Sequence, residues 1–213
     1  MMSLYFAPLA CSLATRIAFY EAGAHVEYIQ VDTRAKRLRD GSDFYPVNPL
    51  GQVPVLRTEE GWLLSENTAI LPYVADRFPA AQLAPPAGTL QRARLQQWLG
   101  FIGTELHKAV FVPLLDRHAP EEVKRYAREK VALRMGMLQK QLAANDYLLD
   151  GFSVADAYLF AVLNWGPFTG VDLAPWPAVG AYYKRLLKRA SIAEALAEEV
   201  AIYEQEVAQH AAR

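Results

Sequence analysis

The chain has 213 residues, of which 53% are hydrophobic and 21% are charged. That apolar content is enough for a buried core and too high for a disordered chain. Lys and Arg total 22 against 23 Asp and Glu, so the formal net charge is -1 and the basic excess typical of nucleic-acid binding is missing. With Cys11 as its single cysteine, the chain cannot belong to the secreted class stapled by intramolecular disulfides.

The N-terminal stretch does not have the pattern of an export signal. No Lys or Arg precedes Arg16, and Pro8 interrupts the apolar run, whereas a signal needs a basic start followed by about 7 to 15 apolar residues. No apolar stretch approaches the ~20 residues of a membrane span. We therefore expect a cytoplasmic protein that binds neither nucleic acid nor a membrane.

The first eighty residues combine strand and helix signals. Short apolar or alternating runs predict four strands, at Ser3–Phe6, Val26–Val31, Val53–Leu56 and Trp62–Leu64. Helical spacing between the first two predicts a helix over 12–21, with Ser12 as its cap and Gly23 just past its end. The polar turn before Trp62 is too short for a crossover, so the last two strands form an antiparallel hairpin and the sheet is mixed. A helix follows over 66–78, with Pro72 in its interior.

The composition changes after residue 80. Prolines and small residues mark 81–89 as a linker, which separates an α/β domain over 1–80 from an all-α domain over 90–213. Apolar periodicity there predicts helices over 90–115, 120–144, 154–165, 176–189 and 191–209. Ser153 and Asp156 form a capping-box pattern, which has a structural rather than a catalytic role.

Cys11 is the first candidate for chemistry. It follows a predicted strand and loop and falls in the first turn of a predicted helix, where the helix N-terminus favours the thiolate. From a lone cysteine, a small buried apolar residue is the alternative interpretation.

The segment around Val53 and Pro54 is the second candidate. A cis bond before Pro54 would turn the backbone of Val53 outward, so that its N–H and C=O can pair with an extended peptide. An ordinary trans proline at a strand entry is the alternative, and the residues alone leave both open.

Polar and charged groups at the start of the 66–78 helix suggest a receptor for a zwitterion. The helix N-terminus at Asn67 suits a carboxylate and Glu66 suits an ammonium group, although ordinary N-capping explains the same residues. Lys36 is a further candidate partner for a carboxylate, or simply a solvated lysine.

Taken together, these motifs resemble the bacterial beta class of glutathione transferases over essentially the whole chain. The matching stretches are Pro8–Ala14, Asn48–Leu56, Ser65–Asp76, Trp98–Lys108 and Phe152–Tyr158. The resemblance implies a thioredoxin-like N-terminal domain with a mixed four-stranded sheet, followed by an all-helical domain. It also implies a homodimer that uses glutathione as co-substrate, without a metal, at a site at each domain junction.

Carried over residue by residue, the resemblance assigns catalysis to Cys11, which meets the glutathione sulfur, and to His107, which overhangs that sulfur. It assigns glutathione binding to Lys36, Val53, Pro54, Glu66, Asn67 and Thr104. In this assignment Val53 before a cis Pro54 clamps the cysteinyl unit, Glu66 and Asn67 hold the γ-glutamyl end, and Lys36 faces the glycine carboxylate. Without the resemblance, His107 would be interpreted as a helix-surface or core histidine.

The chain departs from the class at several positions. Phe6 stands where Tyr is frequent, Leu9 where Gly is usual, Asn67 where Ser or Gly is usual, and Gly100 where a polar residue can reach the partner subunit's glutathione. Phe6, Leu9 and Trp165 are expected to line the pocket for a small hydrophobic electrophile. The departures predict weakened glutathione affinity, with a larger effect at Gly100 than at Phe6.

The expected activity is therefore conjugation of glutathione to electrophiles, thiol-disulfide exchange through Cys11, or both. A non-catalytic glutathione-binding or scaffold protein of the same fold is the alternative. A stand-alone disulfide reductase is disfavoured because no second cysteine can resolve a mixed disulfide at Cys11.

Overall fold

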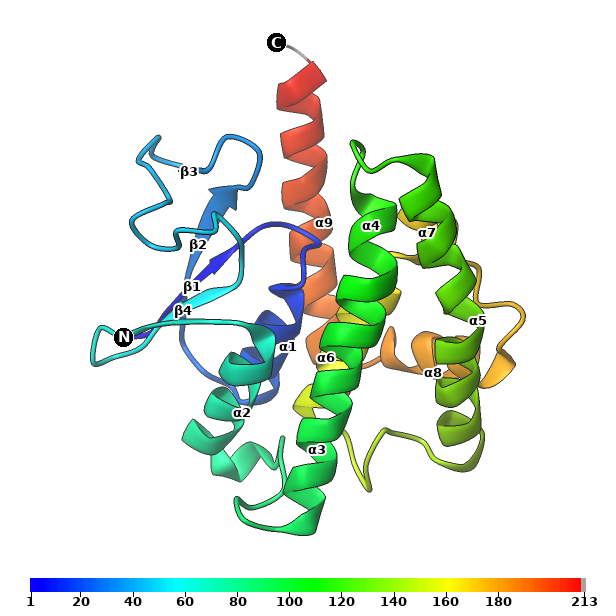
Figure 1. Ribbon diagram of the computed structural model, residues 1–213. Coiled ribbons are helices and arrows are strands. Elements are labelled where there is room, and N and C mark those ends of the chain that lie inside the picture. The colour runs from blue at the N-terminus through cyan, green and yellow to red at the C-terminus, as the bar shows by residue number, and fades with distance from the viewer. Residues whose placement is uncertain (212–213) are drawn as a thin grey trace. The chain divides into compact units, whose positions relative to one another are not determined.

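The structure is a computed structural model that describes residues 1–211, and side chains as far as residue 208. The chain forms two compact units, one made of residues 1–82 together with the segment from 190 onward, and the other of residues 83–189. The last helix, α9 (Ala190–Ala211), packs against α1 (Leu13–Glu21) in the first unit (Figure 1). The units therefore differ from the sequence-based division, which assigned all of 90–213 to one domain.

In the described residues of the first unit, five strands form one mixed sheet in the order β3-β2-β1-β4-β5. The strands are β1 (Ser3–Phe6), β2 (Glu27–Asp32), β3 (Arg37–Leu38), β4 (Val55–Arg57) and β5 (Leu63–Ser65). β1 pairs with β2 in parallel, and the other pairs are antiparallel. The sequence predicted four strands, because β3 has two residues and carries no periodicity that could be recognised. The predicted hairpin is the pair β4 and β5.

The helices of the first unit bury their apolar faces on each other and on the sheet. α1 is buried from Leu13 to Phe19 and packs against α2 (Asn67–Arg77), which holds Pro72 in its interior. A one-turn helix, η1 (Pro79–Ala81), follows. Gly23 has the positive φ of 60° that ends α1. The predicted side-chain cap at Ser12 is wrong, because its hydroxyl group bonds to the backbone of Ala7 instead.

The second unit contains helices in the segments predicted over 90–115, 120–144, 154–165 and 176–189, with ends that differ by up to three residues. Its elements are α3 (Leu90–Phe101), η2 (Ile102–Phe111), α4 (Val112–Leu115), α5 (Glu121–Ala144), α6 (Val154–Leu163), α7 (Gly166–Thr169) and α8 (Pro177–Leu186). The helix predicted over 90–115 is one rod in Figure 1, but its middle part, η2, has π-type hydrogen bonding. Such widened turns are frequent at functional sites, and η2 carries both Thr104 and His107.

A buried carboxylate organises the centre of the second unit. Every residue of α6 is buried. Asp156 Oδ2 accepts hydrogen bonds from the backbone N–H and the hydroxyl group of Ser153, both at 2.9 Å, and Oδ1 accepts from Leu148 N–H at 3.0 Å and Tyr182 O–H at 2.8 Å. The predicted capping box is therefore confirmed, and Asp156 is occupied by structural contacts.

Among the described residues, no helix is long and apolar enough to cross a membrane.

Candidate glutathione site

Cys11 lies in the turn that joins β1 to α1. We call residues 7–12 the cysteine loop. Ala10 N–H donates to Ala7 C=O at 3.1 Å, and Leu13 N–H donates to Ala10 C=O at 3.0 Å, so the chain turns tightly before α1 begins. Cys11 is half-buried and precedes the first helical residue by two positions, whereas the sequence placed it within the first turn. It still lies at the helix N-terminus, where the helix dipole is positive.

The cysteine sulfur lies beside the backbone of Val53. Cys11 Sγ donates a hydrogen bond to the carbonyl oxygen of Val53 at 3.3 Å. The Val53–Pro54 bond is cis, a question that the residues alone could not answer. Two stretches separated by about forty residues in sequence therefore meet at one point, where a thiol lies next to a backbone segment that precedes β4.

Asn67 connects the start of α2 to the same place. Its Nδ2 donates to the carbonyl oxygen of Cys11 at 2.9 Å, and its Oδ1 accepts from the hydroxyl group of Thr15 at 3.1 Å. The side chain is buried, so its amide is used within the fold. Any contact of Asn67 with a ligand would therefore be made by its backbone N–H at the helix start.

Glu66 precedes α2 and its side chain is exposed. Its φ of 69° is in the left-handed region, which a residue with a side chain rarely adopts. Strain of this kind concentrates at ligand-binding positions, where the surroundings hold it in place. Glu66 is thus an exposed carboxylate at a helix N-terminus, adjacent in sequence to the residue that contacts Cys11.

Lys36 lies in the turn between β2 and β3, and its side chain reaches the loop that contains Val53. Its Nζ donates to the carbonyl oxygen of Gly51 at 2.9 Å, and the side chain covers Gly51 so closely that an added Cβ would lie 2.8 Å from Lys36 Cδ. Gly51 also has a φ of 59°, a conformation that favours glycine. The ammonium group of Lys36 is therefore held at the carbonyl of Gly51, which precedes Val53 by two residues.

His107 belongs to a cluster inside the second unit. Its Nδ1 lies 2.7 Å from the hydroxyl oxygen of Tyr158, and its ring centroid is 4.9 Å from that of Trp165. Burial, with a smaller contribution from Lys108, lowers the pKa of His107 to about 4. The imidazole is therefore neutral at neutral pH. Thr104 lies one turn earlier and is exposed, and its hydroxyl group donates to Gly100 C=O at 2.9 Å.

Two functional candidates escaped the sequence analysis. Tyr158 is buried and is the hydrogen-bond partner of His107. Glu199 on α9 is fully buried, and its spacing after Ile192 and Ala195 places it on the buried stripe of that helix. A glutamate at a core position of an amphipathic helix is a signal that the sequence does contain.

Phe6, at the end of β1, is held by cationic and aromatic neighbours. Only 2% of its surface is exposed, and its ring packs against the guanidinium group of Arg16 at 4.3 Å and edge-on against Tyr28. It also contributes to a cavity of about 470 Å³ in the first unit, together with Gln30 and Ile202. Within the described part of the chain, no three His, Cys, Asp or Glu side chains gather as metal ligands would.

Comparison with known proteins identifies one family in both units, and it is the family that the sequence motifs resemble. Residues 2–76 match the family model for the glutathione S-transferase N-terminal domain, and residues 104–190 match the one for the C-terminal domain. Glutathione S-transferase GstA of Escherichia coli O157:H7 is 37% identical over 199 residues, which cover 93% of this chain and 98% of that protein.

Two solved structures resemble the chain closely. The sphingomonad glutathione S-transferase complexed with glutathione is 44% identical with a TM-score of 0.88, and the bacterial beta-class enzyme of Sphingomonas chungbukensis is 43% identical with a TM-score of 0.89. In both comparisons 92% of this chain and 98% of the other chain are covered. The chain therefore belongs to the glutathione S-transferase family and has the thioredoxin-like and helical architecture of its bacterial beta class.

Proposed function

We propose that this chain is a cytoplasmic glutathione transferase in which Cys11 reacts at the sulfur of the bound tripeptide. The observation that carries the proposal is the 3.3 Å contact between Cys11 Sγ and the Val53 carbonyl oxygen. An extended peptide that pairs with the backbone of Val53 would bring its own side chain next to Cys11. For glutathione that side chain is the cysteinyl thiol.

The remaining parts of the tripeptide find partners of opposite charge nearby. The exposed carboxylate of Glu66 suits the γ-glutamyl ammonium group, and the N-terminus of α2 at Asn67 suits the adjacent carboxylate. Lys36, held beside Gly51, suits the glycine carboxylate. The relative with glutathione bound supports this choice of ligand.

Two reactions suit these groups. In conjugation, the glutathione thiolate attacks an electrophilic carbon, the carbon–sulfur bond forms, and the leaving group departs with its electron pair. In exchange, the Cys11 thiolate attacks a glutathione mixed disulfide and releases the other thiol. A second glutathione thiolate then attacks the Cys11 mixed disulfide, which gives oxidised glutathione and regenerates Cys11. The chain has no second cysteine, so exchange depends on this external thiol.

The remaining proposed groups come from the second unit, apart from Leu9 in the cysteine loop. We assign His107 to proton transfer at the reacting sulfur, a role that its neutral imidazole allows. Thr104 on the same segment is assigned to glutathione binding. Leu9 and Trp165 are assigned to the surface that receives a small hydrophobic electrophile, as the family resemblance implies.

Intact-protein mass spectrometry after incubation with oxidised glutathione tests the proposal. Wild-type protein should gain one glutathionyl group and Cys11→Ala should gain none. The alanine variant should lose thiol exchange and retain part of the conjugation, because Val53 and Glu66 do not need the sulfur to hold the tripeptide. A wild-type protein that binds glutathione while Cys11 stays unreactive toward it and toward iodoacetamide would favour the non-catalytic scaffold.

We also propose a homodimer, on the strength of the family resemblance. Sedimentation equilibrium at micromolar concentration decides this. A single species at twice the chain mass of 23.8 kDa is expected, and a monomer would contradict the proposal.

A further inference from the structure

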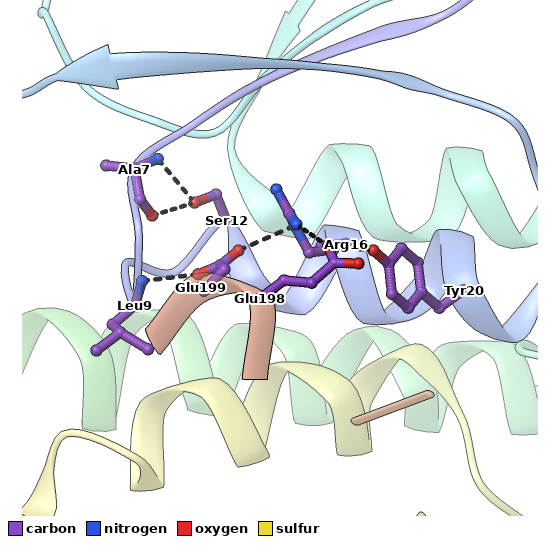
Figure 2. Close-up of polar contacts among 7 residues, drawn as sticks. All are labelled: Ala7, Leu9, Ser12, Arg16, Tyr20, Glu198 and Glu199. Carbon is purple, nitrogen blue, oxygen red and sulfur yellow. Dashed lines mark hydrogen bonds and ion pairs between the residues drawn. The ribbon is translucent and has the colours of Figure 1, made fainter. Parts of the chain in front are cut away.

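The cysteine loop is tied to α9 by a single buried carboxylate. Within the loop, Ser12 Oγ accepts from Ala7 N–H at 3.3 Å and donates to Ala7 C=O at 3.2 Å. At its middle, Leu9 N–H donates to Glu199 Oε2 at 2.7 Å. Figure 2 shows these contacts, with the Glu199 carboxylate directed at the Leu9 backbone. Because Leu9 and Cys11 are two residues apart, the position of the Leu9 peptide affects where the Cys11 sulfur lies.

Leu9 needs such support. Its φ of 59° is in the left-handed region, where a side chain with a Cβ is disfavoured and glycine is not. A residue keeps this conformation only where its surroundings impose it. The hydrogen bond to Glu199 is short, at 2.7 Å, and lies in a buried environment where a lost acceptor is costly.

Glu199 is in turn held by Arg16. The Arg16 Nε atom lies 3.2 Å from Glu199 Oε1, and Arg16 Nη1 lies 2.7 Å from Glu198 Oε2. The guanidinium carbon lies 4.3 Å from the centroid of the Phe6 ring and 4.1 Å from that of the Tyr28 ring. Both Arg16 and Glu199 are buried. A buried acid is thus fixed between a cation from α1 and the backbone of the cysteine loop.

We propose that Glu199 is a positioning residue for Cys11, acting through the Leu9 backbone to hold the cysteine loop in its reactive geometry. This rests on the proposed function, because it assumes that the Cys11 thiolate reacts. Glu198, its neighbour on α9, contacts Arg16 and accepts a hydrogen bond from Tyr20 O–H at 2.6 Å. Glu198 is the matched control, because it shares the cation without being the acceptor of the Leu9 N–H.

The test compares three variants by the second-order rate of Cys11 alkylation with iodoacetamide and by the rate of glutathionyl adduct formation. Glu199→Leu fills the volume but has no acceptor for Leu9 N–H, so both rates should fall roughly tenfold, in line with the cost of misplacing a reacting group. Glu199→Gln keeps an acceptor oxygen and should stay within about twofold of wild type. Glu198→Gln should also stay within about twofold. Glutathione affinity should change little in all three, so that the loss appears in rate rather than in binding.

A double variant tests the same link from the other side. Leu9→Gly placed in the Glu199→Leu background should restore most of the rate, since glycine adopts the positive φ without being held. A glutamate that merely balances the charge of Arg16 would give equal losses in Glu199→Gln and Glu199→Leu and no rescue by glycine. That result in folded proteins, as judged by circular dichroism, overturns the inference.

Two further results separate the possible failures. If the leucine variant does not fold, hydrogen exchange of the Leu9 amide is measured in the wild-type protein. Strong protection of this amide is expected. Exchange at the rate of an exposed loop amide would overturn the inference. If wild-type Cys11 itself does not react, the proposed function has failed. If wild-type protein reacts and every Glu199 variant reacts equally well, the function stands and the role of Glu199 is wrong.

Discussion

Asn67 ties the start of α2 to the carbonyl oxygen of Cys11 through a 2.9 Å hydrogen bond from its side-chain amide. The same amide accepts from the Thr15 hydroxyl group on α1 at 3.1 Å. One buried side chain thus joins the cysteine loop, the helix that follows it, and the helix whose N-terminus is proposed to bind the γ-glutamyl end of glutathione.

Replacing Asn67 with alanine should destabilise the protein by about 2 kcal/mol, because two hydrogen bonds are lost and the hydroxyl group of Thr15 is left buried without its acceptor. Urea unfolding of the variant measures this. The control is Asn145→Ala, since Asn145 is exposed and makes one local contact with Gln141 C=O, so its removal should cost about 0.5 kcal/mol or less. Equal effects of the two substitutions would contradict the structural role given to Asn67.

Glu66→Gln should weaken glutathione binding roughly tenfold to a hundredfold, which corresponds to about 1.5 to 3 kcal/mol for a hydrogen bond to a charged group. Glutamine keeps the size of the side chain and removes the charge that would pair with the ammonium group. Isothermal titration calorimetry gives the affinity. Glu60→Gln, a neutral substitution of an exposed acid in the preceding turn, should bind as wild type does. An unaltered affinity in Glu66→Gln would mean that the ammonium group is held elsewhere.

His107 should make the protein less stable as the pH falls from 6.5 to 4. The pKa of the folded imidazole is lowered to about 4 by burial, from 6.5, so in this window the unfolded chain binds a proton that the folded chain does not. The unfolding free energy therefore falls with falling pH, by at most about 3 kcal/mol from this group.

Urea unfolding of His107→Gln at several pH values measures that contribution as a difference from wild type. His118→Gln, at an exposed position, is the control and should keep the wild-type slope. In activity assays His107→Ala should slow turnover roughly tenfold or more if the imidazole transfers a proton. A pH slope unchanged by the substitution at 107 would show that the imidazole titrates normally in the folded protein.

Most of the fold followed from local patterns that the final structure preserves. β1 occupies the predicted residues, and α1 begins within one residue of its predicted start, since apolar spacing and Gly23 mark both elements clearly. Ser153 and Asp156 form the predicted capping box for the same reason: the four residues that make it are adjacent. Local signals suffice where the partners are close in sequence.

The remaining features depend on contacts that no local pattern encodes. The two-residue strand β3 is defined by its pairing with β2. Arg16 and Leu9 meet Glu199, the buried acid of α9, across more than 180 residues. Asn67 was proposed as a ligand contact, yet its amide faces Cys11 and Thr15. The sequence could therefore name candidate residues for the site, but not the partner of each side chain.

Glu199 should give a pH dependence of the opposite sign to that of His107. Burial raises the pKa of the Glu199 carboxyl group from 4.5 to about 8, against the opposing effects of Arg16 and of the Leu9 N–H, while Glu198 on the same helix raises it further. Tyr20 and Tyr28 face the same cluster, and the pKa of each is raised, mainly by burial, so both stay neutral in this range. Between pH 4.5 and 8 the folded chain therefore holds a proton that the unfolded chain has lost. The unfolding free energy therefore falls as the pH rises through this window, by about 1 kcal/mol per pH unit and by a few kcal/mol in total.

Urea unfolding of Glu199→Gln from pH 5 to 8.5 tests this expectation. The glutamine variant cannot titrate, so its unfolding free energy, measured relative to wild type, should improve steadily as the pH rises and level off above about 8. Glu198→Gln is the matched control, because nearly half of the Glu198 side chain is exposed and its removal should leave the wild-type slope in place. A constant difference between Glu199→Gln and wild type over the whole range would show that Glu199 is already ionised at pH 5. In that case its ion pair with Arg16 outweighs the cost of burying the charge, and the Leu9 N–H is held by a carboxylate at every pH at which the enzyme works.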